Sequence, residues 1–124
     1  MRETIKAFKA LSDETRLRIL NVLLERECCV CEVMQALDIS QTRASRNLAA
    51  LYDAGFLKLR KHGFWSLYSI DRDDMNKCLG DLVQAVTKAL EGNKALEQDR
   101  ERLKKAVRVG ASCAQKMRGE VGVT

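Results

Sequence analysis

The sequence of 124 residues contains no proline, only one histidine and no apolar run long enough to span a bilayer. It also lacks a signal peptide, since residues 1–4 lead directly into a polar amphipathic stretch. We therefore expect a cytoplasmic protein with no membrane partner. Because proline is absent, the ends of helices must be located from glycines and capping residues.

The usual marks of an enzyme are missing as well. There is no glycine-rich loop for phosphate and no pair of carboxylates on a face expected to be buried, and the histidine does not lie where a pocket is expected. Asp73 and Asp74 are interpreted as negative charge at the start of a helix. We therefore predict no catalytic activity.

A series of short helical patterns occupies the first half of the chain. Apolar residues at helical spacing predict a helix over residues 3–11, and Ser12 is expected to cap a second helix that runs to about Arg26. Third and fourth helices are predicted over residues 31–37 and 41–54. Two short helices joined by a tight turn form the helix-turn-helix pattern.

The fourth helix has recognisable ends and an apolar inner face. Ser40 is expected to cap its start, and Gly55 to end it in a left-handed conformation. Its buried face is predicted to consist of Ala44, Leu48 and Leu51. The opposite face is polar, as a helix that reads DNA requires.

A hairpin and two further helices complete the predicted fold. Strands are expected over 56–60 and 64–70, with Lys61-His62-Gly63 at the tip, and a basic hairpin in this place is a wing. A long amphipathic helix should begin at Asp73, followed by a charged helix over 94–108. The second helix is predicted to bury Leu17, Leu20, Leu23 and Leu24.

The fold class is thus mainly α with a small β-hairpin, a winged helix-turn-helix followed by a helical extension. We assign residues 1–91 to a DNA-binding and dimerisation domain, and residues 92–124 to a charged helical extension with a flexible tail. The core of so small a domain is filled by its first four helices. The apolar stripe of the last long helix is therefore expected to form a homodimer, together with the first helix. The predicted interface residues are Ile5, Phe8, Met75, Leu79, Leu82, Val83, Val86 and Leu90.

The positive charge of the chain supports a double-stranded DNA partner. The net charge is +5, and the basic excess is concentrated in residues 41–62. The alternative is a solvated helix that happens to lie beside a basic hairpin. Against it, the helix cap, the helical spacing, the terminating glycine and the wing follow one another in the order that a winged helix-turn-helix requires. The residues expected to contact DNA are Gln41, Thr42, Arg43, Ser45, Arg46, Arg60, Lys61 and His62.

Five cysteines are unusual in a chain without export signals. Cys28, Cys29 and Cys31 fall within four residues and offer a soft, all-sulfur site of the kind that suits As(III) or Sb(III). Cd and Pb usually require a fourth ligand. Two alternatives stay open: packing of small buried thiols, and a redox or persulfide switch with a partner such as Cys78. Cys113, on the tail, is at most an auxiliary ligand.

Four motifs follow one another in a fixed order along the chain. They are LSDETRLRIL at 11–20, CVCEV at 29–33, SQ at 40–41 leading into SRNL at 45–48, and AGFL at 54–57. Together they resemble the ArsR/SmtB family of metalloregulatory repressors, over roughly residues 3–91. The resemblance implies a dimeric winged helix that binds operator DNA and is released when an inducer binds. Within that family the Cys-Val-Cys motif marks the arsenite and the cadmium/lead branches.

Departures from the family narrow the inducer. Arsenic sensors often carry a third cysteine where this chain has Met34, and Cys28 is the natural substitute. Zinc sensors need histidines and carboxylates in the last helix, and His62 lies on the wing, so no zinc site is expected. Cadmium and lead sensors draw cysteines from an N-terminal arm that has none here. We predict a repressor released by As(III) or Sb(III); the alternative senses Cd/Pb or thiol oxidation with the same fold.

The spacing of the cysteines suggests a mechanism. On an ideal helix residues three apart share a face, whereas residues two apart point in nearly opposite directions. Cys28 and Cys31 could therefore converge on a regular helix, but Cys29 and Cys31 could not. We expect that binding all three thiolates distorts the start of the third helix, which displaces the recognition helix.

Overall fold

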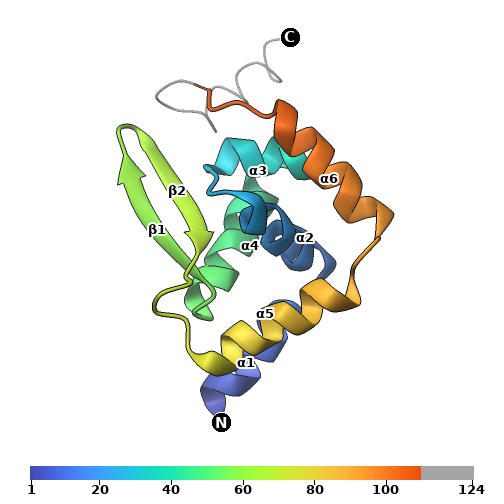
Figure 1. Ribbon diagram of the computed structural model, residues 1–124. Helices are drawn as coiled ribbons and strands as arrows, with labels where there is room; N and C mark the ends of the chain where they lie inside the picture. The colour runs from blue at the N-terminus through green and yellow to red at the C-terminus, as the bar shows by residue number, and fades with distance from the viewer. Residues whose placement is uncertain (110–124) are drawn as a thin grey trace.

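The computed structural model describes residues 1–109 and forms a helical body from which a β-hairpin projects (Figure 1). Figure 1 shows α3 and α6 at one end of this body, α1 and α5 at the other, and α2 between them. The predicted winged helix-turn-helix is confirmed. In chain order the elements are α1 (Arg2–Leu11), α2 (Glu14–Glu25), α3 (Val30–Leu37), α4 (Gln41–Asp53), β1 (Leu57–His62), β2 (Trp65–Ile70), α5 (Lys77–Ala89) and α6 (Lys94–Lys105).

The second helix is capped one residue later than predicted. Asp13, not Ser12, is its N-cap, because Asp13 has the extended backbone and its carboxylate accepts a hydrogen bond of 3.1 Å from the Arg16 amide. Ser12 instead ends α1, its amide donating to the Lys9 carbonyl. Placing Asp13 at the cap also brings its negative charge to the positive end of the helix dipole.

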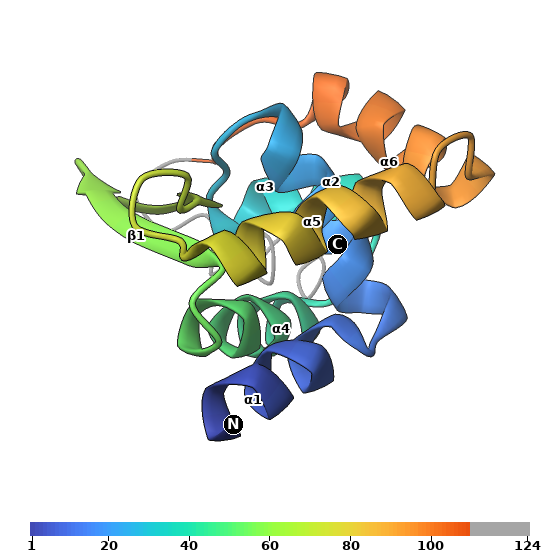
Figure 2. The same cartoon turned by 60° about the horizontal axis from the view of Figure 1, so that its bottom comes forward.

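The predicted ends and inner face of α4 are confirmed. The Ser40 hydroxyl accepts a hydrogen bond of 3.2 Å from the Arg43 amide, and Gly55 has a φ of +95°. The three apolar residues predicted to face inward, at positions 44, 48 and 51, have no exposed surface. Figure 2 shows α4 on the side of the body that carries α1, beneath α5.

The tip of the wing is shorter than predicted. Strand β1 continues through Lys61 and His62, which pair with Ser66 and Trp65, so only Gly63 and Phe64 form the turn. Gly63 has a φ of +63°, the conformation that a two-residue hairpin loop requires and glycine permits. Lys61 and His62 are therefore held in the register of the strand rather than presented at a loose tip.

The last two helices are shorter than predicted. Helix α5 begins at Lys77, after the side chain of Asn76 accepts a hydrogen bond of 2.9 Å from the Leu79 amide. Asp73 and Asp74 lie in the turn before it and do not supply the charge of its first turn. Helix α6 ends at Lys105, and residues 106–109 are extended or irregular. None of the helices in residues 1–109 is long and apolar enough to cross a membrane.

A single main core fills the body. It is built around residues with almost no exposed surface, among them Ile19, Leu20 and Phe56. Leu17 and Leu24, which were predicted to be buried, are only partly buried and pack against the main core. Helix α6 packs against α2 and α3 and contributes to this core. The division of the chain at residue 91 stays a prediction.

Candidate functional site

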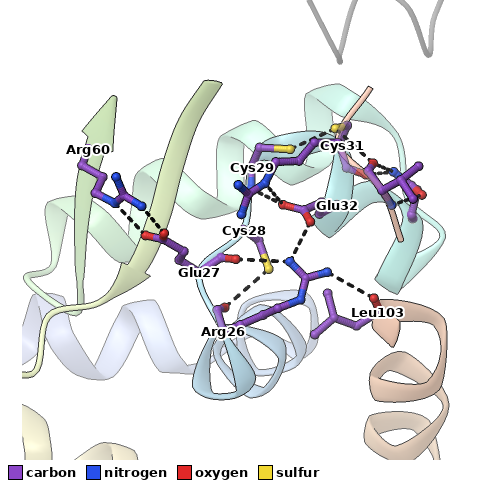
Figure 3. Close-up of polar contacts among 11 residues, drawn as sticks. Arg26, Glu27, Cys28, Cys29, Cys31, Glu32, Arg60 and Leu103 are labelled. Carbon is purple, nitrogen blue, oxygen red and sulfur yellow. Dashed lines mark hydrogen bonds and ion pairs between the residues drawn. The ribbon is translucent and has the colours of Figure 1, made fainter. Parts of the chain in front are cut away.

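Two of the cysteine thiols meet at the start of α3. Cys29 is the N-cap residue, with φ −83° and ψ 170°, and Cys31 lies in the first turn. Their Sγ atoms are 2.9 Å apart, within reach of a hydrogen bond between the thiols (Figure 3). The expectation that Cys29 and Cys31 point in nearly opposite directions does not hold, because Cys29 precedes the helix and its extended backbone turns the side chain back over the first turn. The distortion expected when all three thiolates bind stays a prediction.

Within residues 1–109, neither of the two remaining cysteines is brought to this pair. The Cys28 sulfur lies in the main core and points away, 3.5 Å from the Arg26 carbonyl oxygen (Figure 3). Cys78 is exposed on α5, and Cys113 lies outside the described residues. Within residues 1–109, accordingly, no group of three histidine, cysteine, aspartate or glutamate side chains is arranged to hold a metal ion.

The three thiols are buried, and the pKa of two of them is raised. Cys28, Cys29 and Cys31 are at most 1% exposed. Burial raises the pKa of Cys28 to about 12, and the nearby Glu32 carboxylate adds to the shift. The pKa of Cys29 is raised by its hydrogen bond with Cys31 and by burial. A ligand that binds Cys29 must therefore displace a proton from a neutral thiol.

The buried carboxylate of Glu32 holds residues 27–31, which we call the thiol segment, in place. Glu32 accepts hydrogen bonds from the Cys29 amide at 2.9 Å, from Arg26 at 2.6 Å and from Arg108 at 2.9 Å (Figure 3). Burial alone would raise the pKa of Glu32, but these three donors outweigh it and hold the pKa below its usual value. Glu32 thus links the cap of α3 to α2 and to the chain beyond α6.

The segment after α6 covers the thiol pair. Gln35 receives a hydrogen bond of 3.1 Å from the Val107 amide and donates one of 2.8 Å to the Val107 carbonyl oxygen. That oxygen also lies 3.8 Å from the Cys31 sulfur, and Val109 packs against the cluster of Cys29, Cys31 and Leu67. We call residues 106–109 the strap. Its position depends on α6, which is fixed by two hydrogen bonds of 2.8 Å from Arg18 to the fully buried Asp99.

The wing covers the thiol pair from another side. Leu67 of β2 is fully buried in one small cluster with Cys29 and Cys31, and Trp65 packs against that cluster. Sequence reasoning missed Glu32, Trp65 and the strap. A signal for Glu32 existed, because an acid three residues after an N-cap forms the capping box, here with cysteine in place of serine. No local pattern indicates the other two, which reach the site through tertiary packing.

The residues predicted to read DNA from α4 divide into free and engaged side chains. Thr42 and Arg46 are exposed. The Gln41 amide donates a hydrogen bond of 3.0 Å to the Ser45 hydroxyl. Arg43 leans onto α2 and donates a hydrogen bond of 2.8 Å to the Thr15 hydroxyl. Arg46 is therefore the cation of α4 most available to a phosphate or a base.

The predicted DNA contacts of the wing are exposed, and two of them have partners. Arg60 forms a two-pronged ion pair with Glu27, the residue that precedes the cysteines (Figure 3). Lys61 donates a hydrogen bond of 2.8 Å to the Ser66 hydroxyl. His62 lies at the end of β1, opposite Trp65. These contacts hold the cationic side chains along one strand.

The predicted dimer residues also divide into two groups. Ile5 and Phe8 of α1 are 47% and 55% exposed, as an interface formed with a second chain requires. Leu79 and Val83 are buried within the protomer and belong to its own core. Their stripe on α5 is therefore shared with the body of the same chain. The remaining predicted residues, Met75, Leu82, Val86 and Leu90, are partly exposed.

A protein-family model, "Bacterial regulatory protein, arsR family", matches residues 13–58. The chain is 40% identical over 97 residues to the arsenical resistance operon repressor of Escherichia coli, an alignment that covers 69% of this chain and 83% of that protein. It is 42% identical over 76 residues to a cadmium resistance transcriptional regulatory protein, a CadC homolog of Staphylococcus aureus, with 60% and 63% covered.

A solved structure has the same fold. It is a homodimeric winged helix-turn-helix DNA-binding domain from Mycobacterium bovis, 27% identical, with a TM-score of 0.62. The likeness covers 75% of this chain and 82% of that domain.

Proposed function

The chain belongs to the arsR family of bacterial regulatory proteins, and we propose that it is a repressor whose operator complex dissociates when trivalent arsenic or antimony binds Cys29 and Cys31. As a member of that family it is a DNA-binding transcriptional repressor and not an enzyme. The observation that carries the proposal is the 2.9 Å separation of the two thiols at the start of α3. Paired thiols select soft, thiophilic ions.

Arsenite can bind such a pair without any change of oxidation state. Arsenite is neutral As(OH)₃, and each protonated thiol that replaces a hydroxide releases one molecule of water. Cys29 and Cys31 together would form two sulfur–arsenic bonds and leave one hydroxide on the metalloid. A third thiol would replace that hydroxide in the same way. The hydroxides take up the thiol protons, so neutral, buried thiols suit this ligand.

Two cysteines compete for the third position. Cys28 is adjacent in sequence, but its sulfur lies in the main core, and turning it toward the pair requires residue 28 to leave that core. Cys113 follows Val109 by four residues in the sequence, and Val109 packs against the cluster that contains the thiol pair. We propose Cys113 as the third ligand, with Cys28 as the alternative that serine variants at each position will separate.

We propose that operator DNA is read by a homodimer. The N-terminal half of α4 carries Thr42 and Arg46 on its exposed side, where a recognition helix contacts base edges and phosphates. The wing adds Arg60, Lys61 and His62. The exposed Ile5 and Phe8 of α1 support pairing through α1 and α5, as does the homodimeric state of the M. bovis domain. The proposed dimer would present two recognition helices to one face of the duplex.

The thiol site and the recognition helix are connected by packing, since α3 lies against α4. Thermodynamic linkage requires that an inducer which weakens operator binding also binds more weakly to the operator-bound protein. We infer that capture of the metalloid shifts the start of α3 and, through it, α4.

Two other inducers are each favoured by one observation. The cadmium resistance regulator among the relatives favours Cd or Pb, although the pair would then need further ligands. The contact between the Cys29 and Cys31 sulfurs favours oxidation to a disulfide by a peroxide, in which the two thiols lose two electrons and two protons.

One titration separates these candidates. A duplex selected from a random library for binding is held in complex with the full chain, and arsenite, antimonite, Cd²⁺ and hydrogen peroxide are added in turn. Release by arsenite or antimonite at equimolar concentration is the expected result. Release by peroxide or by Cd²⁺, with arsenite without effect, would contradict the proposal and favour the corresponding alternative.

A further inference from the structure

The thiol segment is attached to the wing through its backbone. Cys28 and Tyr68 form an antiparallel bridge, in which the Cys28 amide donates to the Tyr68 carbonyl oxygen at 3.0 Å and the Tyr68 amide donates to the Cys28 carbonyl oxygen at 2.8 Å. Strand β2 thus has β1 on one side and residue 28 on the other. The segment behaves as a short third strand of the wing.

Side chains reinforce this attachment on both sides of the bridge. Before it, Glu27 forms its ion pair with Arg60 of β1, and the guanidinium holds the pKa of that carboxyl below its usual value. After it, Leu67 is buried against Cys29 and Cys31, and Trp65 packs on the same cluster. The indole Nε1 of Trp65 is buried and has no hydrogen-bond partner within residues 1–109, so packing dominates the placement of the ring there.

The thiol pair is enclosed by the residues that the structure describes. Cys29 and Cys31 are at most 1% exposed, and their surroundings are the wing on one side and the strap on the other. A third atom that bonds to both sulfurs must displace neighbouring side chains, because protein interiors are close-packed. The wing residues around the thiol pair are also bonded to or packed against residues 27–31. A shift of residues 29–31 is therefore transmitted directly to β2.

We propose that inducer capture is transmitted to the wing, in addition to α4, through Trp65 and through the Glu27–Arg60 ion pair. This inference rests on the proposed function, since it describes how a ligand at the thiol pair acts on DNA binding. Trp65 is a wing residue that packs against the cluster of Cys29, Cys31 and Leu67, and Glu27 is a positioning residue for a cation expected at the DNA backbone. Movement of the segment changes where the wing holds Arg60.

The test measures a coupling factor, the ratio of the operator Kd with saturating arsenite to the operator Kd without it. Glu27→Gln removes the ion pair with little risk to folding, and Trp65→Val removes the aromatic contact while keeping a residue that suits a strand. We expect each change to reduce the coupling factor by about threefold or more, the size of effect that an exposed ion pair or a single contact supports. The arsenite affinity of the DNA-free Glu27→Gln protein should not change.

Two control variants remove the same kind of side chain, a carboxylate and an aromatic ring, at positions outside the ion pair and the thiol cluster. Glu25→Gln removes the same charge from an exposed position of α2, and Phe64→Val removes an aromatic ring from the exposed wing tip. Both should keep the full coupling factor, even where the operator Kd itself shifts. A full coupling factor in Glu27→Gln and in Trp65→Val would overturn the inference.

Direct binding distinguishes this failure from failure of the proposed function. Trp65 is the only tryptophan, so its emission reports on the wing beside the thiol pair. One equivalent of arsenite should produce ultraviolet absorption from sulfur–arsenic bonds together with a change in emission. Absorption without any change in emission would contradict the contact between wing and ligand alone. Absence of the absorption in the unmodified protein would overturn the proposed function and this inference with it.

Discussion

Helices α3 and α4 both begin with a short side chain at the N-cap, but in opposite surroundings. Ser40 caps α4 at the exposed surface, beside the exposed Thr42 and Arg46. Cys29 caps α3 in the interior, where Glu32 completes the cap and the second thiol, the wing and the strap enclose it. The same local device thus leaves one helix start exposed and the other enclosed.

The difference teaches that burial, rather than the cap itself, sets the chemistry of a helix start. An open N-terminus can attract phosphate through its free amides and its dipole. The amide of Cys29 is already taken by Glu32, and that carboxylate places a negative charge at the start of α3. The start of α3 is therefore unsuited to an anion and suited to a neutral molecule that exchanges its own hydroxides for thiols.

The largest expected effect comes from removing the thiols. The double variant Cys29→Ser/Cys31→Ser should bind the selected duplex with nearly unchanged affinity and should no longer release it on addition of arsenite. Its coupling factor should fall from about 5–150 to about one. Fluorescence anisotropy of the labelled duplex measures both quantities. Loss of DNA binding in the untreated variant would show that the pair is structural and would break the comparison.

The second-largest expected effect is a difference between Cd²⁺ and arsenite in how their affinities for the protein depend on pH. Cys29 must release a proton when it binds Cd²⁺, because the pKa of its thiol is raised above the usual value. Cd²⁺ affinity should therefore rise with pH, by about tenfold per unit for this proton. Arsenite loses hydroxide as water, so its affinity should stay nearly constant between about pH 6 and 8. Competition titrations across this range check the signs, and a steep rise for arsenite would contradict the proposed exchange.

A smaller effect is expected at the open helix start. Arg46→Ala should weaken operator binding about tenfold, as expected for loss of one direct contact with base or phosphate. The arsenite affinity of the DNA-free protein should be unaffected, because Arg46 lies on the exposed side of α4. Lys88→Ala on α5, also exposed, is the matched control. An operator affinity that does not change in the Arg46 variant would remove this residue from the reading surface.

The smallest effect concerns the exposed cap. Ser40→Ala removes the hydrogen bond from the Arg43 amide and should lower the free energy of unfolding by about 1 kcal/mol. Thr42→Ala, at an exposed position two residues after Ser40, should change the free energy of unfolding much less. Urea unfolding followed by circular dichroism gives both values. Equal effects of the two variants would mean that the Ser40 cap contributes nothing beyond the intrinsic preferences of the residues.

Much of the fold could be predicted because its signals are local. Ser40, Gly55 and the three buried apolar residues of α4 act within a few residues of one another, so their pattern is readable along the chain. Errors occurred where two local candidates competed. Ser12 and Asp13 can both cap a helix, and the choice was made by the backbone conformation of Asp13. In the same way, α5 begins after the N-cap residue Asn76 and not at Asp73.

The thiol site was predicted in composition but not in geometry. Three neighbouring cysteines and their soft-ligand chemistry were evident from the chain alone. Whether Cys29 stands inside or before the helix could not be read from its spacing, and that single position decides which sulfurs meet. The partners of the pair are also distant in sequence, since Leu67 and Val109 lie more than thirty residues away.

Interactions between near neighbours in the chain specify the order of the elements, the basic helix α4 and the presence of a thiol cluster, so these features are readable from the amino-acid sequence. Long-range packing is what makes two thiols rather than three converge within residues 1–109 and encloses them between the wing and the strap. The reason is physical: a capped helix start forms locally, whereas its enclosure requires segments that meet only when the chain has buried its core.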